Sequence, residues 1–341
     1  MTILRTLLDN FWHTDIWLPP NVTWADLEPN DKVQYADYKD LCIPLPMALC
    51  LLVLRYFLEK YWFSPFGTYL GIKNTKLKRA PPNELLEKAF KQNSRMKYKE
   101  VISIAKQLDM SERQIERWLR LRRTQEKPST LTKFCENSWR CLYYVYSFIF
   151  GIICLWDKPW LWDINECWTN YPHQSITRGP WWYYMTSLAF YWSLTVSQFR
   201  DVKRKDFWQM FIHHIATIVL MDFSWVCNLH RVGTLVLLVH DCADIFLEAA
   251  KMAKYAKYQK VCDTLFAIFT ILWIVTRLGI FPFWILYSTT VTAPRTVNTT
   301  FPAYYIFNGL LYLLLILHIF WTHLILKIAY QAIASGQVNL K

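Results

Sequence analysis

Two adjacent histidines and two nearby carboxylates are the residues of this sequence best suited to chemistry. His213 and His214 lie in "QMFIHHIATIVL" (209–220), and Asp241 and Asp244 lie in "VHDCADIFLEAAKM" (239–252), both within apolar runs. A carboxylate beside an imidazole orients it and makes it more basic, as in general-base and nucleophilic catalysis. An ionised carboxylate in the centre of a bilayer costs about 3 kcal/mol, so it indicates a function. The four residues are therefore predicted to be catalytic.

Helical spacing places further polar groups beside these four. Asp241 and Asp244 share one face (i, i+3), while His240, Asp244 and Glu248 form a neighbouring line (i, i+4, i+8). Thr217 is one turn from both histidines and could bond either. Adjacent residues on a helix point about 100° apart, so one histidine is expected to face the reacting centre and the other a stabilising partner. The sequence does not say which.

The two polar sets are expected to lie at the same depth in the membrane. Only about four residues, 228–231, join the two apolar runs, so the runs should form antiparallel neighbours. His213 is about sixteen residues from this turn and Asp244 about fourteen, and each residue adds about 1.5 Å. The histidines and aspartates are therefore predicted to meet, in the cytosolic half of the membrane.

Two other interpretations of this cluster have to be weighed. Two His and two Asp could bind a metal, but membrane di-iron enzymes carry many histidines in HxxxH and HxxHH boxes. The remaining histidines form no such box: His13, His173, His230, His318 and His323. No metal site is therefore predicted. A polar bridge that only holds helices together is the second interpretation; two groups of each kind at matched depth, with Glu248 adjacent, favour a functional site.

The rest of the chain indicates a membrane protein. The sequence is 54% hydrophobic and 17% aromatic, and its apolar residues gather in long blocks. A transmembrane helix needs about 20 mainly apolar residues. We therefore predict an all-α polytopic membrane protein with about seven transmembrane helices. The candidate spans are 41–58, 139–156, 181–199, 208–227, 232–250, 263–287 and 303–330.

The charge distribution predicts the orientation of these spans. The net charge of +12 is concentrated in 59–138, 200–205 and 251–260, whereas 157–180 and 288–302 carry few cations. Lys and Arg collect in cytosolic loops, so the N-terminus should be lumenal and the C-terminus cytosolic. The glycosylation sequons at Asn21 and Asn298 then fall on the lumenal side. No cleavable signal peptide is visible, so the first span should act as the targeting signal.

A basic segment at 76–128 differs in kind from the membrane spans. Ser111 is a plausible helix cap, and Ile115, Trp118 and Leu119 form an apolar stripe. The segment resembles the last two helices of a homeodomain, with no convincing first helix. Leu121 stands where a homeodomain has its adenine-reading Asn, and the segment is tethered to a membrane. We therefore expect a cytosolic docking or lipid-facing module that does not bind DNA.

The motifs "DVKRKDF", "HH", "HDCADIFLEAAKM" and "TRLGIFPFW", on this spacing of spans, resemble the ceramide synthases. These are acyl-CoA:sphingoid base N-acyltransferases of the endoplasmic reticulum, with a TRAM/Lag1/CLN8-type domain. The resemblance covers nearly the whole chain and includes the lumenal "WLPPNVTWADLE". It implies an organisation by residue range: a lumenal segment 1–40, a first transmembrane helix 41–58, the homeodomain-like insert 76–128, a catalytic membrane domain 131–332 and a short cytosolic tail 333–341.

The resemblance also implies an activity. The histidine pair and the two acidic residues of the family match His213, His214, Asp241 and Asp244. The implied reaction moves a fatty acyl group from acyl-CoA, as co-substrate, to the amine of sphinganine or sphingosine, without a permanently bound cofactor. A histidine could deprotonate the amine, or could carry the acyl group as an acyl-imidazole; the covalent route is slightly favoured. A multi-pass protein of the endoplasmic reticulum is expected, as a homodimer or a heterodimer with related synthases.

The resemblance, together with the charge distribution, also suggests where the substrates bind. The phosphates of coenzyme A stay outside the bilayer, so the cations before the histidine pair are candidates for binding them: Arg200, Lys203, Arg204 and Lys205. In the family, the loop between the last two spans, here 288–302, helps to set acyl-chain length. "AAKMAKYAKYQK" and "TRLGIFPFW" look most like members that prefer palmitoyl-length chains.

Two departures from the family pattern and one alternative function remain. The chain stops at "SGQVNLK", where the family usually has an acidic tail, so either regulation through that tail is missing or the sequence is truncated. Leu119 stands where related modules usually have Phe. Other proteins with this domain type bind or sense membrane lipids without established chemistry, and that is the alternative to an enzyme.

Overall fold

The computed structural model describes residues 2–29, 33–72, 80–93, 96–125 and 128–338, and in these ranges it is helical without strands. The N-terminal part and the insert contain α1 (Thr2–Phe11), α2 (Thr14–Trp17), α3 (Pro44–Leu58), α4 (Ser64–Tyr69), α5 (Glu84–Gln92), α6 (Tyr98–Leu108) and α7 (Glu112–Gln125). The bundle that follows contains α8 (Thr130–Leu155), α9 (Pro159–Trp162), α10 (Arg178–Ser197), α11 (Phe207–Val226), α12 (His230–Tyr255), α13 (Gln259–Trp273), α14 (Ala293–Val297) and α15 (Pro302–Ser335). The predicted all-α class is confirmed.

Short 3₁₀ and π-helical segments link several of these helices. The 3₁₀ segments are η1 (Trp24–Leu27), η2 (Tyr38–Cys42) and η4 (Ile164–Cys167). The π-helical segments are η3 (Glu59–Phe63), η5 (Ile274–Leu286) and η6 (Ser288–Thr292). As a result, α3 to α4 and α13 to α14 each form one long helical run.

Among the described residues, four helical segments are long and apolar enough to cross a membrane: Tyr38–Tyr69, Thr130–Leu155, Gln259–Val297 and Pro302–Ser335. The other three predicted spans coincide with α10, α11 and α12, which are helices of 20, 20 and 26 residues. These three do not meet the same length and hydropathy criteria. Two of them, α11 and α12, carry the polar residues of the candidate site. That all three also cross the membrane stays a prediction.

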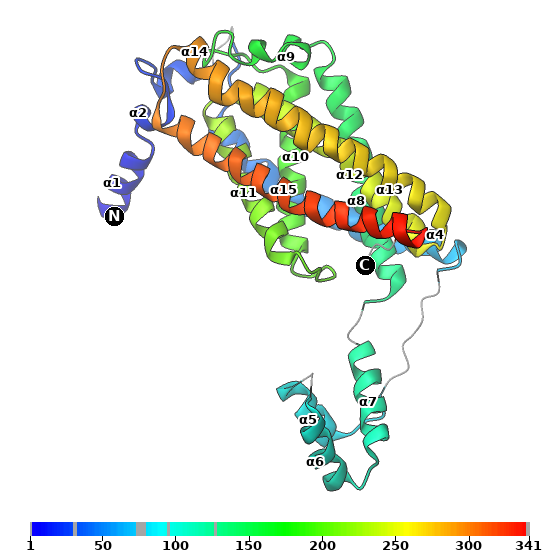
Figure 1. The fold of residues 1–341 in the computed structure, drawn as a ribbon. Coiled ribbons are helices and arrows are strands. Elements are labelled where there is room, and N and C mark those ends of the chain that lie inside the picture. Colours follow the sequence, from blue (N-terminus) through cyan, green and yellow to red (C-terminus); the bar gives the residue numbers. More distant parts are fainter. Residues whose placement is uncertain (1, 30–32, 73–79, 94–95, 126–127, 339–341) are drawn as a thin grey trace.

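The central helix of the bundle is α12. It packs against α8, α13, η5, α11 and α10, while α15 runs beside η5 and contacts α11 (Figure 1). The largest apolar core cluster contains Tyr183, Tyr184 and Leu188 of α10, all fully buried. Polar residues on α12 are therefore surrounded by helices on several sides, which decides the partners they can reach.

The insert is a three-helix unit, α5 to α7, drawn apart from the bundle in Figure 1. The prediction that it lacks a first helix is wrong, because α5 places Leu86 and Phe90 against Trp118 of α7. Trp118 Nε1 also donates a hydrogen bond to Pro81 O at 2.6 Å. The first helix escaped detection because nine residues with two core positions show too little periodicity.

The contact between α8 and α10 depends on a glycine. A methyl group built at Gly151 of α8 would lie 2.8 Å from Cζ of the fully buried Tyr183. Gly309 of α15, by contrast, has no atom within 4 Å of such a methyl group. The two glycines therefore form a matched pair, one at a close helix contact and one in open space.

We expect Gly151→Ala to lower the free energy of unfolding by about 1–3 kcal/mol, because the added methyl overpacks the core. Gly309→Ala should raise it by about 0.5–1 kcal/mol, because alanine loses less backbone entropy in a helix. Thermal melting of both variants in detergent measures the difference. Equal melting temperatures for the two variants would contradict this account of the α8–α10 contact.

Candidate active site

The histidine pair lies on α11, facing Tyr191 of α10. The ring centroids of His213 and His214 are 6.4 and 6.3 Å from that of Tyr191. His214 is buried, and its Nδ1 lies 3.0 Å from Oε1 of Gln198. Gln198 donates through Nε2 to Phe207 O at 2.7 Å, so its oxygen faces His214 and accepts. Nδ1 of His214 therefore carries the proton, and its Nε2 keeps a lone pair.

No ring nitrogen of His213 has a hydrogen-bond partner among the described residues. Its Nδ1 is also buried. Its ring meets Trp321 of α15 edge to face, with centroids 5.5 Å apart. Thr217, expected to bond one of the imidazoles, donates to the backbone oxygen of His213 at 2.8 Å instead. The two histidines thus differ in that Nδ1 of His214 has a hydrogen-bond partner and Nδ1 of His213 has none among the described residues.

The two aspartates have partners other than the histidine pair. Asp241 accepts a hydrogen bond from Ser147 of α8 at 2.6 Å, and Asp244 accepts one from Arg277 of η5 at 3.1 Å. The structure gives neither carboxylate a hydrogen bond with His213 or His214. The predicted contact between the histidines and the aspartates is therefore not among the contacts observed. Helical spacing predicts the depth of a side chain along its helix axis, but not the direction in which that side chain points.

Arg277 and His318 are site residues that the sequence reasoning missed. Arg277 Nη2 also donates to the backbone oxygen of His240 at 2.6 Å. His240 Nδ1 lies 2.6 Å from Val236 O, so it donates there, and its Nε2 accepts from Nε2 of His318 at 3.1 Å. A lone arginine inside an apolar span was the available signal. His318 forms no metal-binding box, so no sequence pattern points to it.

A π-helical segment presents Arg277 to α12. Pro282 lies inside η5 and cannot donate a backbone hydrogen bond, and its ring crowds the carbonyl one turn earlier. π-helical turns are rare and often found at functional sites. The guanidinium of Arg277 also covers the ring of Trp273, 5.0 Å from its centroid.

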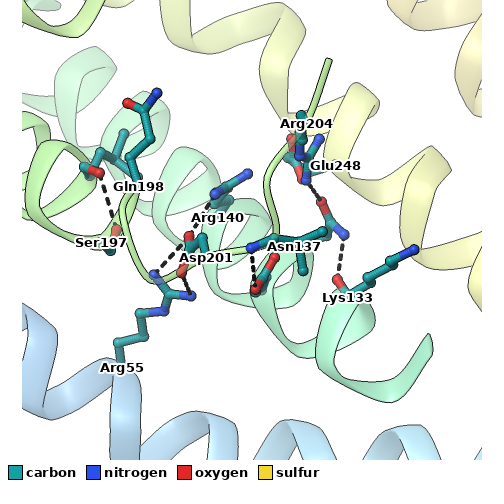
Figure 2. Close-up of polar contacts among 12 residues, drawn as sticks. Arg55, Lys133, Asn137, Arg140, Ser197, Gln198, Asp201, Arg204 and Glu248 are labelled. Carbon is teal, nitrogen blue, oxygen red and sulfur yellow. Dashed lines mark hydrogen bonds and ion pairs between the residues drawn. The ribbon is translucent and has the colours of Figure 1, made fainter. Parts of the chain in front are cut away.

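Glu248 and the basic loop lie together at the end of the site that is predicted to be cytosolic (Figure 2). Glu248 pairs with Lys251 at 2.5 Å, and Arg204 donates to Asn137 Oδ1 at 2.9 Å (Figure 2). The three other candidate phosphate ligands are exposed and make no ion pair within the described ranges: Arg200, Lys203 and Lys205. The loop that carries them begins at Gln198, the partner of His214.

A cavity of about 90 Å³ lies between this site and the end of the bundle predicted to be lumenal. Its inner end is lined by His240, Tyr191 and Thr217, and its outer end by Ala293 and Val297 of α14. Most of the wall between them is apolar. Two of its polar groups are satisfied within the wall, because the hydroxyl of Tyr184 bonds Ser224 and Asn308 accepts from Thr289. A lining of this composition suits an apolar ligand such as a hydrocarbon chain.

Two further sequence predictions concern metals and glycans. In the described part of the chain, no group of three or more His, Cys, Asp or Glu side chains is arranged to hold a metal ion. The sequon residues Asn21 and Asn298 are both exposed, each at a positive φ, 66° and 55°. Both lie in connections near the end of the bundle predicted to be lumenal.

The sequence has clear relatives. Residues 133–327 match the TLC domain (TRAM, LAG1, CLN8), and residues 82–128 match the homeodomain. Ceramide synthase 5 of Mus musculus is 47% identical over 96% of this chain and 80% of its own length. Ceramide synthase 3 of Homo sapiens is 43% identical, over 98% and 87%. Ceramide synthase hyl-1 of Caenorhabditis elegans is 33% identical, over 96% and 82%. The chain therefore belongs to the ceramide synthase family of TLC-domain proteins.

Proposed function

We propose that this protein is a ceramide synthase that transfers a fatty acyl group from acyl-CoA to the amine of sphinganine or sphingosine. One observation supports this proposal beyond family membership: two residues that line the apolar cavity also lie beside His213, whose Nδ1 has no hydrogen-bond partner among the described residues. Tyr191 and Thr217 line the cavity and also contact His213. An acyl chain lying in the cavity would bring its carbonyl carbon close to that imidazole.

The proposed reaction has two steps. A ring nitrogen of His213 attacks the thioester carbonyl, the carbon–sulfur bond breaks, and coenzyme A leaves as a thiolate. The amine then attacks the acyl-imidazole, the amide bond forms and the carbon–nitrogen bond to His213 breaks. The proton lost by the amine balances the charge of the thiolate. In the alternative route, histidine only removes the amine proton while the amine attacks the thioester directly.

Arg277 is proposed to stabilise the negative charge that develops on the carbonyl oxygen. Asp244 and the backbone oxygen of His240 fix the guanidinium, and its Nε has no partner within the described residues. A fixed donor in a site without water stabilises a developing charge more than a mobile one. Asp244 thus acts by holding Arg277, and Asp241 by its bond to Ser147.

The substrates are proposed to occupy the two ends of the site. Coenzyme A lies on the cytosolic side, with its phosphates near Arg200, Lys203 and Lys205. The acyl chain extends towards the 288–302 segment, whose Ala293 and Val297 line the cavity, and chains of about palmitoyl length are proposed to be preferred. We infer a multi-pass protein of the endoplasmic reticulum with a lumenal N-terminus, acting as a dimer.

Intact-protein mass spectrometry tests the covalent route. Purified protein incubated with palmitoyl-CoA alone should gain one acyl mass, which sphinganine then removes. His213→Ala should abolish the adduct because it removes the nucleophile, whereas His214→Ala should slow its formation. Ceramide formation without any adduct would establish direct attack. Neither adduct nor ceramide from any chain length would favour a lipid-binding protein.

Asp244→Asn tests the role of the Arg277 pair. Without the carboxylate, the guanidinium loses the charge that fixes it, so ceramide formation should fall by about 100-fold. Asp222→Asn is the matched control, because Asp222 of α11 makes no hydrogen bond within the described residues. Initial rates for both variants measure the effect. Equal rates for the two would remove Asp244 from the mechanism.

A triple variant tests the coenzyme A site. Arg200→Gln, Lys203→Gln and Lys205→Gln together should raise KM for acyl-CoA by about 10-fold and weaken its dependence on salt, because screened charge attraction is lost. The value of kcat should not change. Lys257→Gln with Lys260→Gln, two exposed cations elsewhere on the cytosolic side, is the control. An unchanged KM in the triple variant would place the phosphates elsewhere.

A further inference from the structure

The connection between α10 and α11 is held by buried charges. We infer that Arg55 of α3, Asp201 and Arg140 of α8 are positioning residues: they fix this loop and, through Gln198, the ring of His214. The inference rests on the proposed function and adds residues outside the predicted site. Arg55 also lies outside the segment that matches the TLC domain.

Asp201 is the centre of the network. Arg55 binds its carboxylate with two parallel hydrogen bonds, Nη2 to Oδ1 at 2.8 Å and Nη1 to Oδ2 at 3.2 Å. Arg140 adds a bond from Nη2 to Oδ2 at 2.8 Å (Figure 2). The side chains of Asp201 and Arg55 are only 8% and 9% exposed, so water does not replace these bonds. Two-pronged pairs of this kind fix geometry as well as charge.

The first half of α8 holds the same loop at two further points. Glu136 accepts a hydrogen bond from the backbone N–H of Val202 at 3.2 Å, and Asn137 accepts one from Arg204. With Arg140, these residues occupy little more than one turn of α8. The loop is thus bound on one side by α8 and on the other by Arg55, so it cannot shift without breaking several bonds.

A short path connects this anchor to His214. The backbone N–H of Asp201 donates to Ser197 O at 2.8 Å, which closes the turn at the end of α10. Gln198 follows directly, and its amide spans Phe207 O and His214 Nδ1. If the loop moved and the amide turned over, its NH₂ group would face Nδ1 and favour the other tautomer. The anchor therefore controls which nitrogen of His214 holds the lone pair.

The network is better suited to positioning than to stability. Replacing buried ion pairs by apolar residues is often neutral or stabilising, so such pairs are weak evidence of a stabilising role. Arg55 also binds the carboxylate of Glu59, one helical turn away, at 2.7 Å. The core of the cluster therefore contains two arginines, Arg55 and Arg140, and two acids, Asp201 and Glu59. α3 also packs along α10. The first membrane helix thus contributes to the site without contacting substrate.

The experiment compares three variants of the full-length protein in ceramide synthesis. Arg55→Ala should lower kcat about 10- to 100-fold, because displacing a catalytic group by about 1 Å has this effect. The KM for sphinganine should stay within about twofold, since no contact with that substrate is lost. The KM for palmitoyl-CoA should rise together with the loss of kcat, because the displaced loop also carries Arg200, Lys203 and Lys205. Arg55→Lys should recover part of kcat. Gln198→Leu leaves the ion pairs intact and should reproduce the loss of kcat.

Arg122→Ala is the control, because it breaks a comparable pair with Glu87 in the insert, at 2.7 Å; its kcat should equal that of the wild type. If Arg55→Ala does not accumulate as folded protein, the inference is tested with Gln198→Leu alone. Its melting temperature should equal that of the wild type, so that a lower kcat reports the position of His214. Wild-type kcat in Gln198→Leu, or a raised KM for palmitoyl-CoA with unchanged kcat in Arg55→Ala, would overturn the inference. Absence of ceramide formation in the wild type would instead overturn the proposed function.

Discussion

The arrangement of this bundle depends on satisfying the polar side chains of α12 in an apolar environment. Unpaired polar groups are costly where water is absent, and α12 carries several of them within little more than two turns. Their partners come from different elements: His318 from α15, Ser147 from α8 and Arg277 from η5. These requirements place α12 at the centre of the fold and bring η5 and α15 together against it.

The same helix divides the interior into two chemical environments. Towards the predicted lumenal end, Val232, Val236 and Leu237 line the cavity. From His240 onwards the helix carries the buried polar residues Asp241 and Glu248. The boundary lies beside the histidine pair of α11. A substrate with an apolar chain and a charged carrier would place its reactive carbonyl at this boundary, because each part then lies in the solvent that suits it.

The sequence was informative wherever periodicity alone decides the outcome. It located the helices of the bundle and the polar faces of α11 and α12. It did not identify the partners of Asp241 and Asp244, because helical spacing gives height along an axis but not the direction towards a third helix. Arg277 and Ser147 reach α12 from segments far away in the chain, and the Asp201 network needs α3, α8 and the loop at once. Such contacts depend on packing, which one-dimensional patterns do not contain.

Gln198 explains how the site can orient a histidine without the predicted aspartate. In a serine protease triad, a carboxylate holds the imidazole in the right tautomer. A carboxylate touching His214 would add a further charge to an apolar region that already holds Asp241 and Asp244, at a cost of about 3 kcal/mol at the centre of a bilayer. A neutral amide sets the tautomer without that cost, provided that its own orientation is fixed. The bond from Gln198 to Phe207 O supplies this orientation. The charges around Asp201 lie towards the edge that is predicted to be cytosolic, where ion pairs are easier to accommodate.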